Sequence, residues 1–132
     1  LDLHAKAPDE GGAWCGSHPD PQSGWTEGEM PPMPRRAVLM GDFNFEAGSA
    51  EYDLLTGPMT ARYGRLKPLG GLIDAWAAAG HSEASGRSVA DRQARIDHCF
   101  VSTELAETVQ RAWIDESALG SDHFPLWVEM SL

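Results

Sequence analysis

The chain has 132 residues, 42% of them hydrophobic, which is enough for one compact domain and too few for two. Its formal charge is −10, so the composition gives no basic footprint of the kind that binds nucleic acid. A cation held by an acidic site can still present positive charge to a phosphate, so the acidity weakens nucleic-acid binding without excluding it. No apolar stretch approaches the roughly 20 residues of a membrane span, and we expect none.

Residues 1–35 form the first of two segments that the composition separates. Six of the nine prolines fall in this segment, and no helical or strand period is visible there. We predict a Gly/Pro-rich loop segment, which is either mobile and structural, as the composition favours, or touches a ligand through Trp14 or Trp25. Cys15 lies in this loop and Cys99 in a predicted strand, where we interpret it as a small buried apolar residue; a disulfide between them stays open.

Residues 36–132 form the second segment, in which helical and strand signals alternate. Three helices are expected, at 49–57 (Ser49 as cap, Tyr52 and Leu55 on one face, Gly57 as stop), at 71–80 (Ile73 and Trp76 inward) and at 103–108. Four strands are expected, at 37–41 (buried), 95–102, 112–115 and 124–132 (Leu126, Val128 and Met130 on one face), with a polar loop at 81–94. This mixture predicts an α/β fold with a mixed, mainly antiparallel sheet and helices on one face.

The first candidate chemistry lies where the strand over 37–41 ends, at Asp42 and Asn44. In a strand continued through 44 these side chains point the same way. A carboxylate there can orient or deprotonate a water molecule or ligate Mg²⁺, and the amide can donate to a phosphate oxygen. The competing interpretation is an ordinary strand-to-turn junction, where Gly, Asp and Asn are common.

A second candidate is the tripeptide Ser121-Asp122-His123, just before the last strand. A histidine beside a carboxylate is suited to proton transfer near neutral pH, so His123 could act as a general base or donate to a phosphate. Asp122 could ligate a metal ion or the water bound to it. The alternative is a polar loop that enters a strand.

A third candidate is Asp97, near the head of the apolar strand over 95–102. A buried charge costs free energy unless it is paired, and two partners are open: Arg95 on the same face, or the imidazole of His123 on an adjacent strand. A carboxylate on the second ring nitrogen of a histidine fixes its tautomer and raises its basicity. The alternative is a structural Arg–Asp pair.

Together these segments resemble the three C-terminal motifs of the endonuclease/exonuclease/phosphatase superfamily, which includes pancreatic-type deoxyribonucleases, abasic-site endonucleases, neutral sphingomyelinases and inositol polyphosphate phosphatases. The three motifs are Gly41-Asp42-Phe43-Asn44, Arg95-Ile96-Asp97-His98-Cys99-Phe100-Val101-Ser102 and Ser121-Asp122-His123-Phe124-Pro125-Leu126. Leu72-Ile73-Asp74-Ala75-Trp76 resembles the helix between the first two, so the resemblance covers 36–132. These motifs are specific for the superfamily and uninformative about the substrate.

The resemblance implies a role for each matching residue. Asp42 would position and activate the attacking water, Asn44 would contact the phosphate, and Asp97 would orient His123, which would bind or protonate the phosphoryl group. Asp122 would join a Mg²⁺ site, with Mn²⁺ as the alternative ion. We also expect Arg95 to contact the substrate. His98 stands where the family often has an aromatic residue, and we interpret it as strand packing; His4, His18 and His81 are interpreted as loop residues.

The family's N-terminal half has no counterpart in these motifs. The resemblance implies a two-sheet α/β sandwich of roughly twice this length, whose N-terminal half supplies an asparagine, the main metal-ligating glutamate and a further histidine. We therefore expect residues 36–132 to be the C-terminal half of such a domain. Because residue 1 is Leu instead of Met, we expect the chain to have been processed, trimmed or cut from a longer one. Alone, it is expected to bind metal weakly and turn over little substrate.

We predict a Mg²⁺-dependent hydrolase of phosphate esters, a phosphodiesterase or a phosphatase. The alternative is a non-catalytic binding module, a degenerate relative, or a half-site completed by a partner chain that supplies the N-terminal half. Asp42, Asn44, Asp97 and His123 argue against the binding module, which needs none of them. The acidity favours a small phosphorylated molecule over long duplex DNA.

Overall fold

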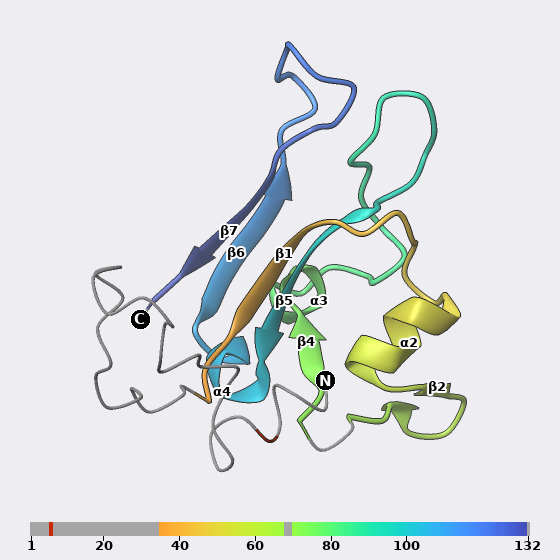
Figure 1. Ribbon diagram of the computed structural model, residues 1–132, viewed down its shortest axis with the longest axis vertical. Coiled ribbons are helices and arrows are strands. Elements are labelled where there is room, and N and C mark those ends of the chain that lie inside the picture. The colour runs from red at the N-terminus through yellow and green to blue at the C-terminus, as the bar shows by residue number, and fades with distance from the viewer. Residues whose placement is uncertain (1–5, 7–34, 68–69, 132) are drawn as a thin grey trace, which may run out of the picture. The chain divides into compact units, whose positions relative to one another are not determined.

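The computed structural model describes residues 6, 35–67 and 70–131. The chain divides into two units, 1–35 and 36–132, and the account below concerns the second (Figure 1). Its elements in chain order are β1 (Val38–Asp42), α2 (Ala50–Thr56), β2 (Met59–Thr60), β3 (Gly64–Arg65), β4 (Leu72–Asp74), α3 (Ala75–Ala78), β5 (Asp97–Ser102), α4 (Thr103–Ala106), β6 (Val109–Ile114) and β7 (Leu126–Met130). Helices and antiparallel sheets together confirm the predicted α/β class.

Strand β5 is the centre of the main sheet. It pairs antiparallel with β1 on one side and with β4 on the other, in the order β1-β5-β4. Cys99, Phe100 and Val101 are at most 2% exposed, because neighbours cover both faces and both edges of β5. In the β1–β5 register Asp42 lies opposite Asp97, so the two carboxylates come from adjacent strand ends.

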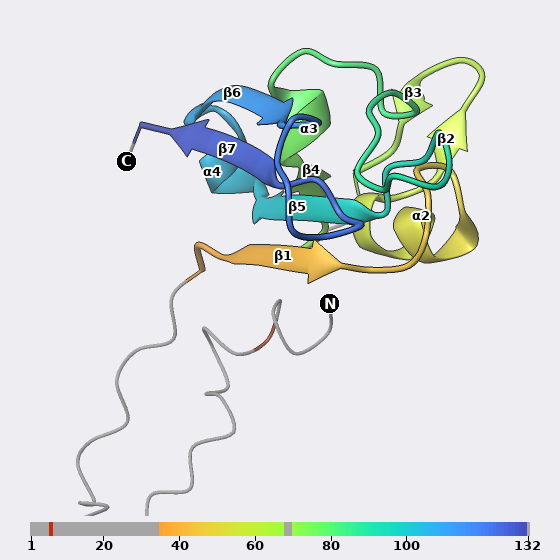
Figure 2. The ribbon, with the colours of Figure 1, turned by 90° about the horizontal axis from the view of Figure 1, so that it is seen from above.

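Strand β1 is exposed, and the expectation of a buried strand is wrong. Val38, Leu39 and Met40 are 49%, 43% and 64% exposed. The reason is position: among the described residues β1 is an edge strand that pairs only with β5. Figure 2 shows β1 at one margin of the unit, with β5 between it and β6 and β7. An apolar run alone cannot separate a central strand from an edge strand.

The larger apolar core lies between β5 and the β6–β7 pair. Ala75, Cys99, Val101, Leu105 and Val109 form its buried centre, and the inward side chains of β7 pack against it. Those side chains are Leu126, Val128 and Met130, while Trp127 and Glu129 are exposed, as the period of two predicts. A smaller cluster of Tyr52, Leu72 and Phe100 joins α2 to the main sheet.

The helix over 49–57 is confirmed, and the helix over 71–80 is partly wrong. Ser49 Oγ accepts the Tyr52 N–H, and Gly57 ends the helix. In the second segment Leu72–Asp74 is strand β4, and only Ala75–Ala78 is helical. Asp74 causes the switch, since its backbone is extended while its Oδ1 accepts the Trp76 N–H and so caps α3.

The remaining differences are at element ends. Helix α4 stops at Ala106 instead of 108, β6 begins at Val109 instead of 112, and β7 spans only Leu126–Met130. The hairpin of β2 and β3 was not expected. No helix of the described residues is long and apolar enough to cross a membrane.

Candidate active site

The turn after β1 carries Asp42 and Asn44 next to each other. Both Asp42 oxygens accept from Asn44: Oδ1 from the backbone N–H at 2.9 Å and Oδ2 from Nδ2 at 3.1 Å. Asn44 has a φ of 56°, so the backbone turns left-handed there instead of extending the strand. The two side chains therefore meet through a turn, a geometry that asparagine tolerates because its amide bonds locally.

His123 is held by Asp97. Its Nδ1 lies 2.9 Å from Asp97 Oδ2, and the two side chains are 33% and 20% exposed. Of the two partners left open for Asp97, the structure selects the imidazole. The hydrogen bond that His123 donates to Asp97 is the main cause that raises the pKa of His123, and the nearby charges of Asp97, Asp42 and Asp122 raise it further.

Ser88, which the sequence did not single out, joins the head of β5 to the segment that follows His123. Its buried Oγ accepts the N–H groups of Ile96 and Asp97, at 3.0 and 3.1 Å, and its carbonyl accepts the Phe124 N–H. Residues 89 and 123 form an antiparallel bridge, which ties the 81–94 loop to the histidine segment. No sequence pattern marks such a serine, because its partners are backbone groups.

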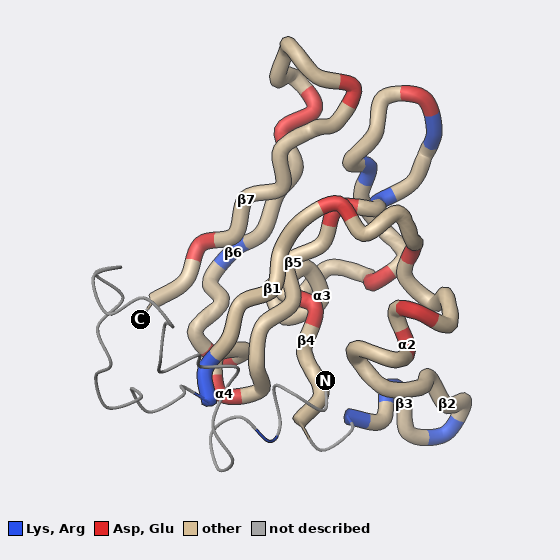
Figure 3. Tube along the Cα trace, viewed as in Figure 1, with Lys and Arg blue, Asp and Glu red and all other residues tan. Residues whose placement is uncertain are grey.

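Asp122 projects from the same loop as His123 and is exposed. Its carbonyl accepts the Ala90 N–H, and its carboxylate is near enough to raise the pKa of His123. Figure 3 shows acidic residues where β1 ends. The end of β1, the head of β5 and the loop before β7 thus bring Asp42, Asp97, Asp122 and His123 to one place.

Arg95 does not face this place. Its side chain is 2% exposed, and Nη2 lies 2.7 Å from Asp74 Oδ2, whose side chain is 1% exposed. Further bonds run from Nε to the Ser85 carbonyl and from Nη2 to the Glu83 carbonyl. This burial argues against the expected contact between Arg95 and the substrate, and we correct that expectation: Arg95 is a structural residue.

The donor chemistry fits a hard divalent ion only in part. Carboxylate and amide oxygens are the ligands that Mg²⁺ and Mn²⁺ prefer, and Asp42, Asn44 and Asp122 offer them. Among the described residues, however, no three His, Cys, Asp or Glu side chains converge to hold a metal ion. The described residues therefore offer at most part of a coordination shell.

A hollow of about 370 Å³ opens beside the histidine. It is lined by Met40, Gly41, Asp97, His98, Ser121, His123, Phe124, Pro125 and Leu126. A second hollow, of about 490 Å³, is lined by Phe43, Asn44, Phe45, Glu46, Ser49, Glu51, Arg92 and Ile96. Asp97 and His123 thus line the first hollow, and Asn44 lines the second.

These features define a site of paired carboxylates, an amide and an oriented histidine at the ends of two strands. The sequence model of the endonuclease/exonuclease/phosphatase family matches residues 18–123. The chain belongs to this family, whose members are generally hydrolytic phosphoesterases. The match begins before residue 36, where the resemblance was expected to begin, and residues 18–34 lie outside the described residues. No curated protein and no solved structure matches the chain significantly.

Proposed function

We propose that the chain hydrolyses phosphate esters by attack of water on phosphorus, with Asp42, Asn44, Asp97 and His123 as the acting residues. The observation that carries this proposal is the Asp97–His123 hydrogen bond at 2.9 Å beside the carboxylate of Asp42. A base for water and an oriented proton donor are two groups that accelerate hydrolysis of a phosphate ester.

The proposed reaction assigns each proton. The oxygen of a water molecule attacks phosphorus while Asp42 takes one of its protons, and the bond from phosphorus to the leaving oxygen breaks. Asn44 Nδ2 carries two hydrogens, and one of them bonds the Asp42 carboxylate. The other donates to a non-bridging phosphate oxygen as negative charge develops there. The leaving oxygen receives its proton from His123 or from solvent.

The electrostatics of His123 favour the donor role over the base role that the sequence left open. Its Nδ1 faces Asp97, so Nε2 is the nitrogen left for the phosphoryl group. Because Asp97 raises the pKa of His123, the imidazolium form persists to higher pH. An imidazolium both attracts a phosphate and donates to it, while a base would have to be neutral.

Mg²⁺, or Mn²⁺ in its place, belongs to this proposal, with Asp122 as the described ligand. Such an ion supplies charge stabilisation to the phosphoryl oxygens when bound. Mn²⁺ added to the ¹⁵N-labelled chain should broaden the resonances of Asp122 and His123 before others, and Asp122→Asn should weaken the effect. Equal broadening in both proteins would remove Asp122 from the metal site.

The direct test is hydrolysis of bis(p-nitrophenyl) phosphate and p-nitrophenyl phosphate, with Mg²⁺ or Mn²⁺, at high protein concentration and long incubation. We expect slow turnover that Asp42→Asn abolishes. Asp115→Asn is the matched control, because Asp115 also follows a strand and accepts the N–H of the residue two positions on, at 3.0 Å. No turnover of either ester, or equal turnover by Asp42→Asn, would contradict the proposal.

The proposed substrate is a small phosphorylated molecule, since the formal charge of −10 disfavours long duplex DNA. Comparison of a p-nitrophenyl nucleotide ester with plasmid DNA at 50 and 200 mM NaCl would test this. Faster cleavage of DNA, with the strong salt dependence of phosphate contacts, would reverse the assignment.

A second candidate, a site completed by a partner chain that supplies the N-terminal half, is favoured by one observation. Val38, Leu39 and Met40 on edge strand β1 are 43–64% exposed, and edge strands carry backbone groups that can pair with another strand. Size exclusion of the chain mixed with the separately expressed N-terminal half of a family member would detect such a complex, and Leu39→Lys should weaken it. Separate elution of the two chains at every concentration would remove this candidate.

A further inference from the structure

His98 is a buried polar residue one position after Asp97. It is 1% exposed, yet every buried side-chain nitrogen or oxygen of the described residues, its own included, has a hydrogen-bond partner. Successive side chains on a strand point to opposite faces, so His98 lies on the face of β5 away from Asp97 and His123. The burial agrees with the expectation of strand packing, and the partners of the two ring nitrogens show which segments the packed ring joins.

The hydrogen bonds of His98 fix its tautomer. Arg95 Nη1 lies 2.6 Å from His98 Nδ1, and a guanidinium can only donate, so Nδ1 is the acceptor. Nε2 must then carry the hydrogen, which it donates to the carbonyl of Phe45 at 2.9 Å. Burial lowers the pKa of His98, in keeping with this neutral form. The ring thus accepts a hydrogen bond from Arg95 and donates one to the Phe45 carbonyl.

Arg95 is itself anchored in the core. The Asp74 carboxylate accepts from Arg95 Nη2 at 2.7 Å, from the Tyr52 hydroxyl at 2.8 Å and from the Trp76 N–H at 2.9 Å. Asp74 also begins helix α3, and Tyr52 belongs to helix α2. The hydrogen bonds to α2, α3 and β5 therefore fix the position of the His98 imidazole.

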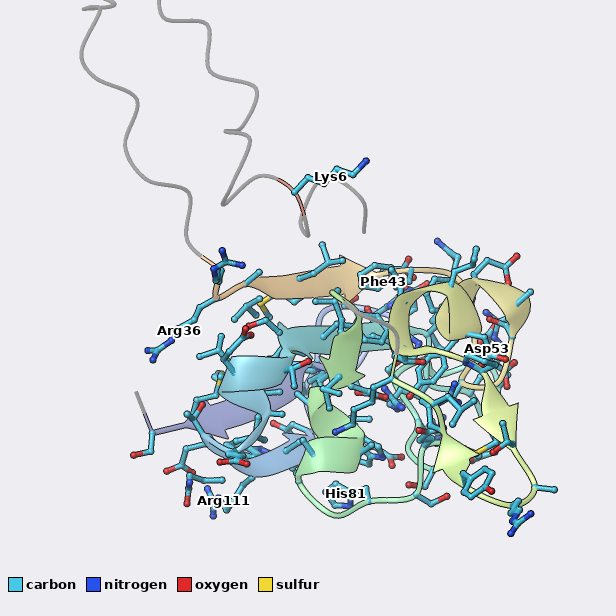
Figure 4. All side chains as sticks on the ribbon, turned by 90° about the horizontal axis from the view of Figure 1, so that it is seen from below. Lys6, Arg36, Phe43, Asp53, His81 and Arg111 are labelled. Carbon is cyan, nitrogen blue, oxygen red and sulfur yellow. The ribbon has the colours of Figure 1, made fainter. Side chains whose placement is uncertain are left out.

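Phe45 belongs to the turn that carries Asn44. The turn is held on one side by the Phe43 N–H, which donates to the Ile96 carbonyl at 3.0 Å, and on the other by His98 at Phe45. The rings of Phe43 and Phe45 pack on the imidazole, with centroids 6.0 and 5.3 Å away. Figure 4 shows Phe43 where β1 ends, beside α2. Between these two fixed residues Asn44 adopts its left-handed φ of 56°.

We infer that His98 is a positioning residue for the proposed hydrolytic site: through the Phe45 carbonyl it holds Asn44, and with it the Asp42 carboxylate, in the orientation that faces the phosphate. Asparagine tolerates a positive φ, and the hydrogen bonds at Phe43 and Phe45 on either side hold Asn44 in that conformation. Without the bond to Phe45 the turn can relax toward an extended backbone, which would separate the Asn44 amide from Asp42. The catalytic part of this inference rests on the proposed function; the structural part does not.

Two substitutions separate hydrogen bonding from packing. His98→Phe keeps an aromatic ring and removes both hydrogen bonds. His98→Gln removes the ring and keeps a terminal acceptor for Arg95 and a donor for Phe45. His81→Phe is the matched control, because His81 Nε2 also bonds a backbone carbonyl, that of Ala112 at 2.8 Å. Figure 4 shows His81 on the opposite side of the unit from Phe43.

The first readout is amide hydrogen exchange at residues 44 and 45, with the ¹⁵N resonances of the Asn44 side chain. We expect His98→Phe to speed exchange at least about ten-fold at these residues and to shift the Asn44 amide, because local opening becomes easier. His98→Gln should stay close to wild type, and His81→Phe should leave both unchanged. Wild-type values in His98→Phe would overturn the inference.

The second readout is turnover of the phosphodiester. Displacement of a reacting group by about 1 Å costs up to about 100-fold, so kcat of His98→Phe should fall by about 10- to 100-fold, with KM changed less than about two-fold. His98→Gln should recover most of kcat. If the wild type shows no turnover while His98→Phe still shifts Asn44, the proposed function fails and the positioning of the turn stands. If the wild type is active and His98→Phe equals it, the catalytic part of the positioning role fails.

Imidazole ¹⁵N shifts of the wild type give a test that needs no variant. They report which ring nitrogen carries hydrogen, and we expect hydrogen on Nε2 of His98 alone at pH 7. Hydrogen on Nδ1 would overturn the inference even if His98→Phe does not fold.

Discussion

His123 Nδ1 and Asp97 Oδ2 lie 2.9 Å apart although 26 residues separate them in the chain, and this contact joins the head of β5 to the loop before β7. Asp97 is also opposite Asp42 in the β1–β5 register. One aspartate therefore connects two otherwise separate segments of the site. The contact leaves Nε2 as the ring nitrogen available to a phosphoryl group.

Removal of the Asp97 charge should lower the pKa of His123. The hydrogen bond to the Asp97 carboxylate is the largest cause of the raised pKa, so Asp97→Asn should bring it down toward the ordinary value of about 6.5. The measurement is an NMR titration of the His123 ring in the presence of a chelator. Asp91→Asn, an exposed aspartate outside these contacts, should leave the curve unchanged. An unshifted curve in Asp97→Asn would mean that the contact does not persist in solution.

Removal of the His123 ring should slow hydrolysis without unfolding the chain. A positioned proton donor contributes about 10²- to 10⁴-fold, so His123→Ala should lower kcat by that factor. Its side chain is partly exposed, so the melting temperature should change little. His81→Ala is the control for loss of a histidine elsewhere, and it should keep its rate. A His123→Ala variant with a near-normal rate would remove this residue from the mechanism.

The parts of the site that the sequence predicted are those in which polar side chains interrupt apolar runs. Asp42, Asp97 and His123 each stand at the end or the head of such a run, and the structure brings them together. The partner of Asp97 could not be chosen from the sequence, because Arg95 and His123 were both chemically suitable. The fold pairs Asp97 with His123.

The buried network of Asp74, Arg95 and His98 could not be predicted for a different reason. Its bonds join residues 21 and 3 positions apart, and no period of two or 3.6 relates them. The strand-to-helix switch at Asp74 was hidden by the alanines that follow, since their helical preference extends naturally over Leu72 and Ile73. Edge position, which exposes β1, is a property of the whole sheet and not of its residues.

The Asp74–Arg95 pair should make a large contribution to the free energy of unfolding. Both side chains are at most 2% exposed, and removal of one partner of a buried pair costs about 3–5 kcal/mol. Asp74→Ala also leaves the Tyr52 hydroxyl and the Trp76 N–H without their acceptor. Urea denaturation measures the effect, and Asp74→Asn, which keeps acceptor capacity, provides a milder variant if Asp74→Ala does not fold.

The control for that substitution is an exposed ion pair. Glu129 and Arg111 lie 2.9 Å apart with side chains more than half exposed, so Glu129→Ala should cost at most about 1 kcal/mol. Equal losses in Asp74→Ala and Glu129→Ala would contradict the assignment of the buried pair as a structural anchor.

Acid should destabilise the fold through His98. Burial lowers the pKa of His98 in the folded state, while the unfolded chain binds a proton near pH 6.5. Between these two pKa values the unfolded state holds more protons, so the free energy of unfolding falls as the pH drops below about 6.5, by at most about 1.4 kcal/mol per pH unit. Asp74 and Asp97 favour the charged ring, and Arg95 disfavours it.

The comparison of wild type with His98→Gln isolates this effect, because glutamine does not titrate and the carboxylates common to both proteins cancel. Urea midpoints at pH 7.5, 6.5 and 5.5 should show a stability advantage of the wild type that shrinks as the pH falls. His123 acts in the opposite sense, because its pKa is raised in the folded state. Its contribution to stability is present below about pH 6.5 and is lost as the pH rises through the pKa of the folded state. This contribution is the same in wild type and His98→Gln, so it cancels in the comparison. A difference independent of pH would show that His98 accepts a proton in the folded state as readily as in the unfolded chain, which the Arg95 hydrogen bond to Nδ1 should prevent.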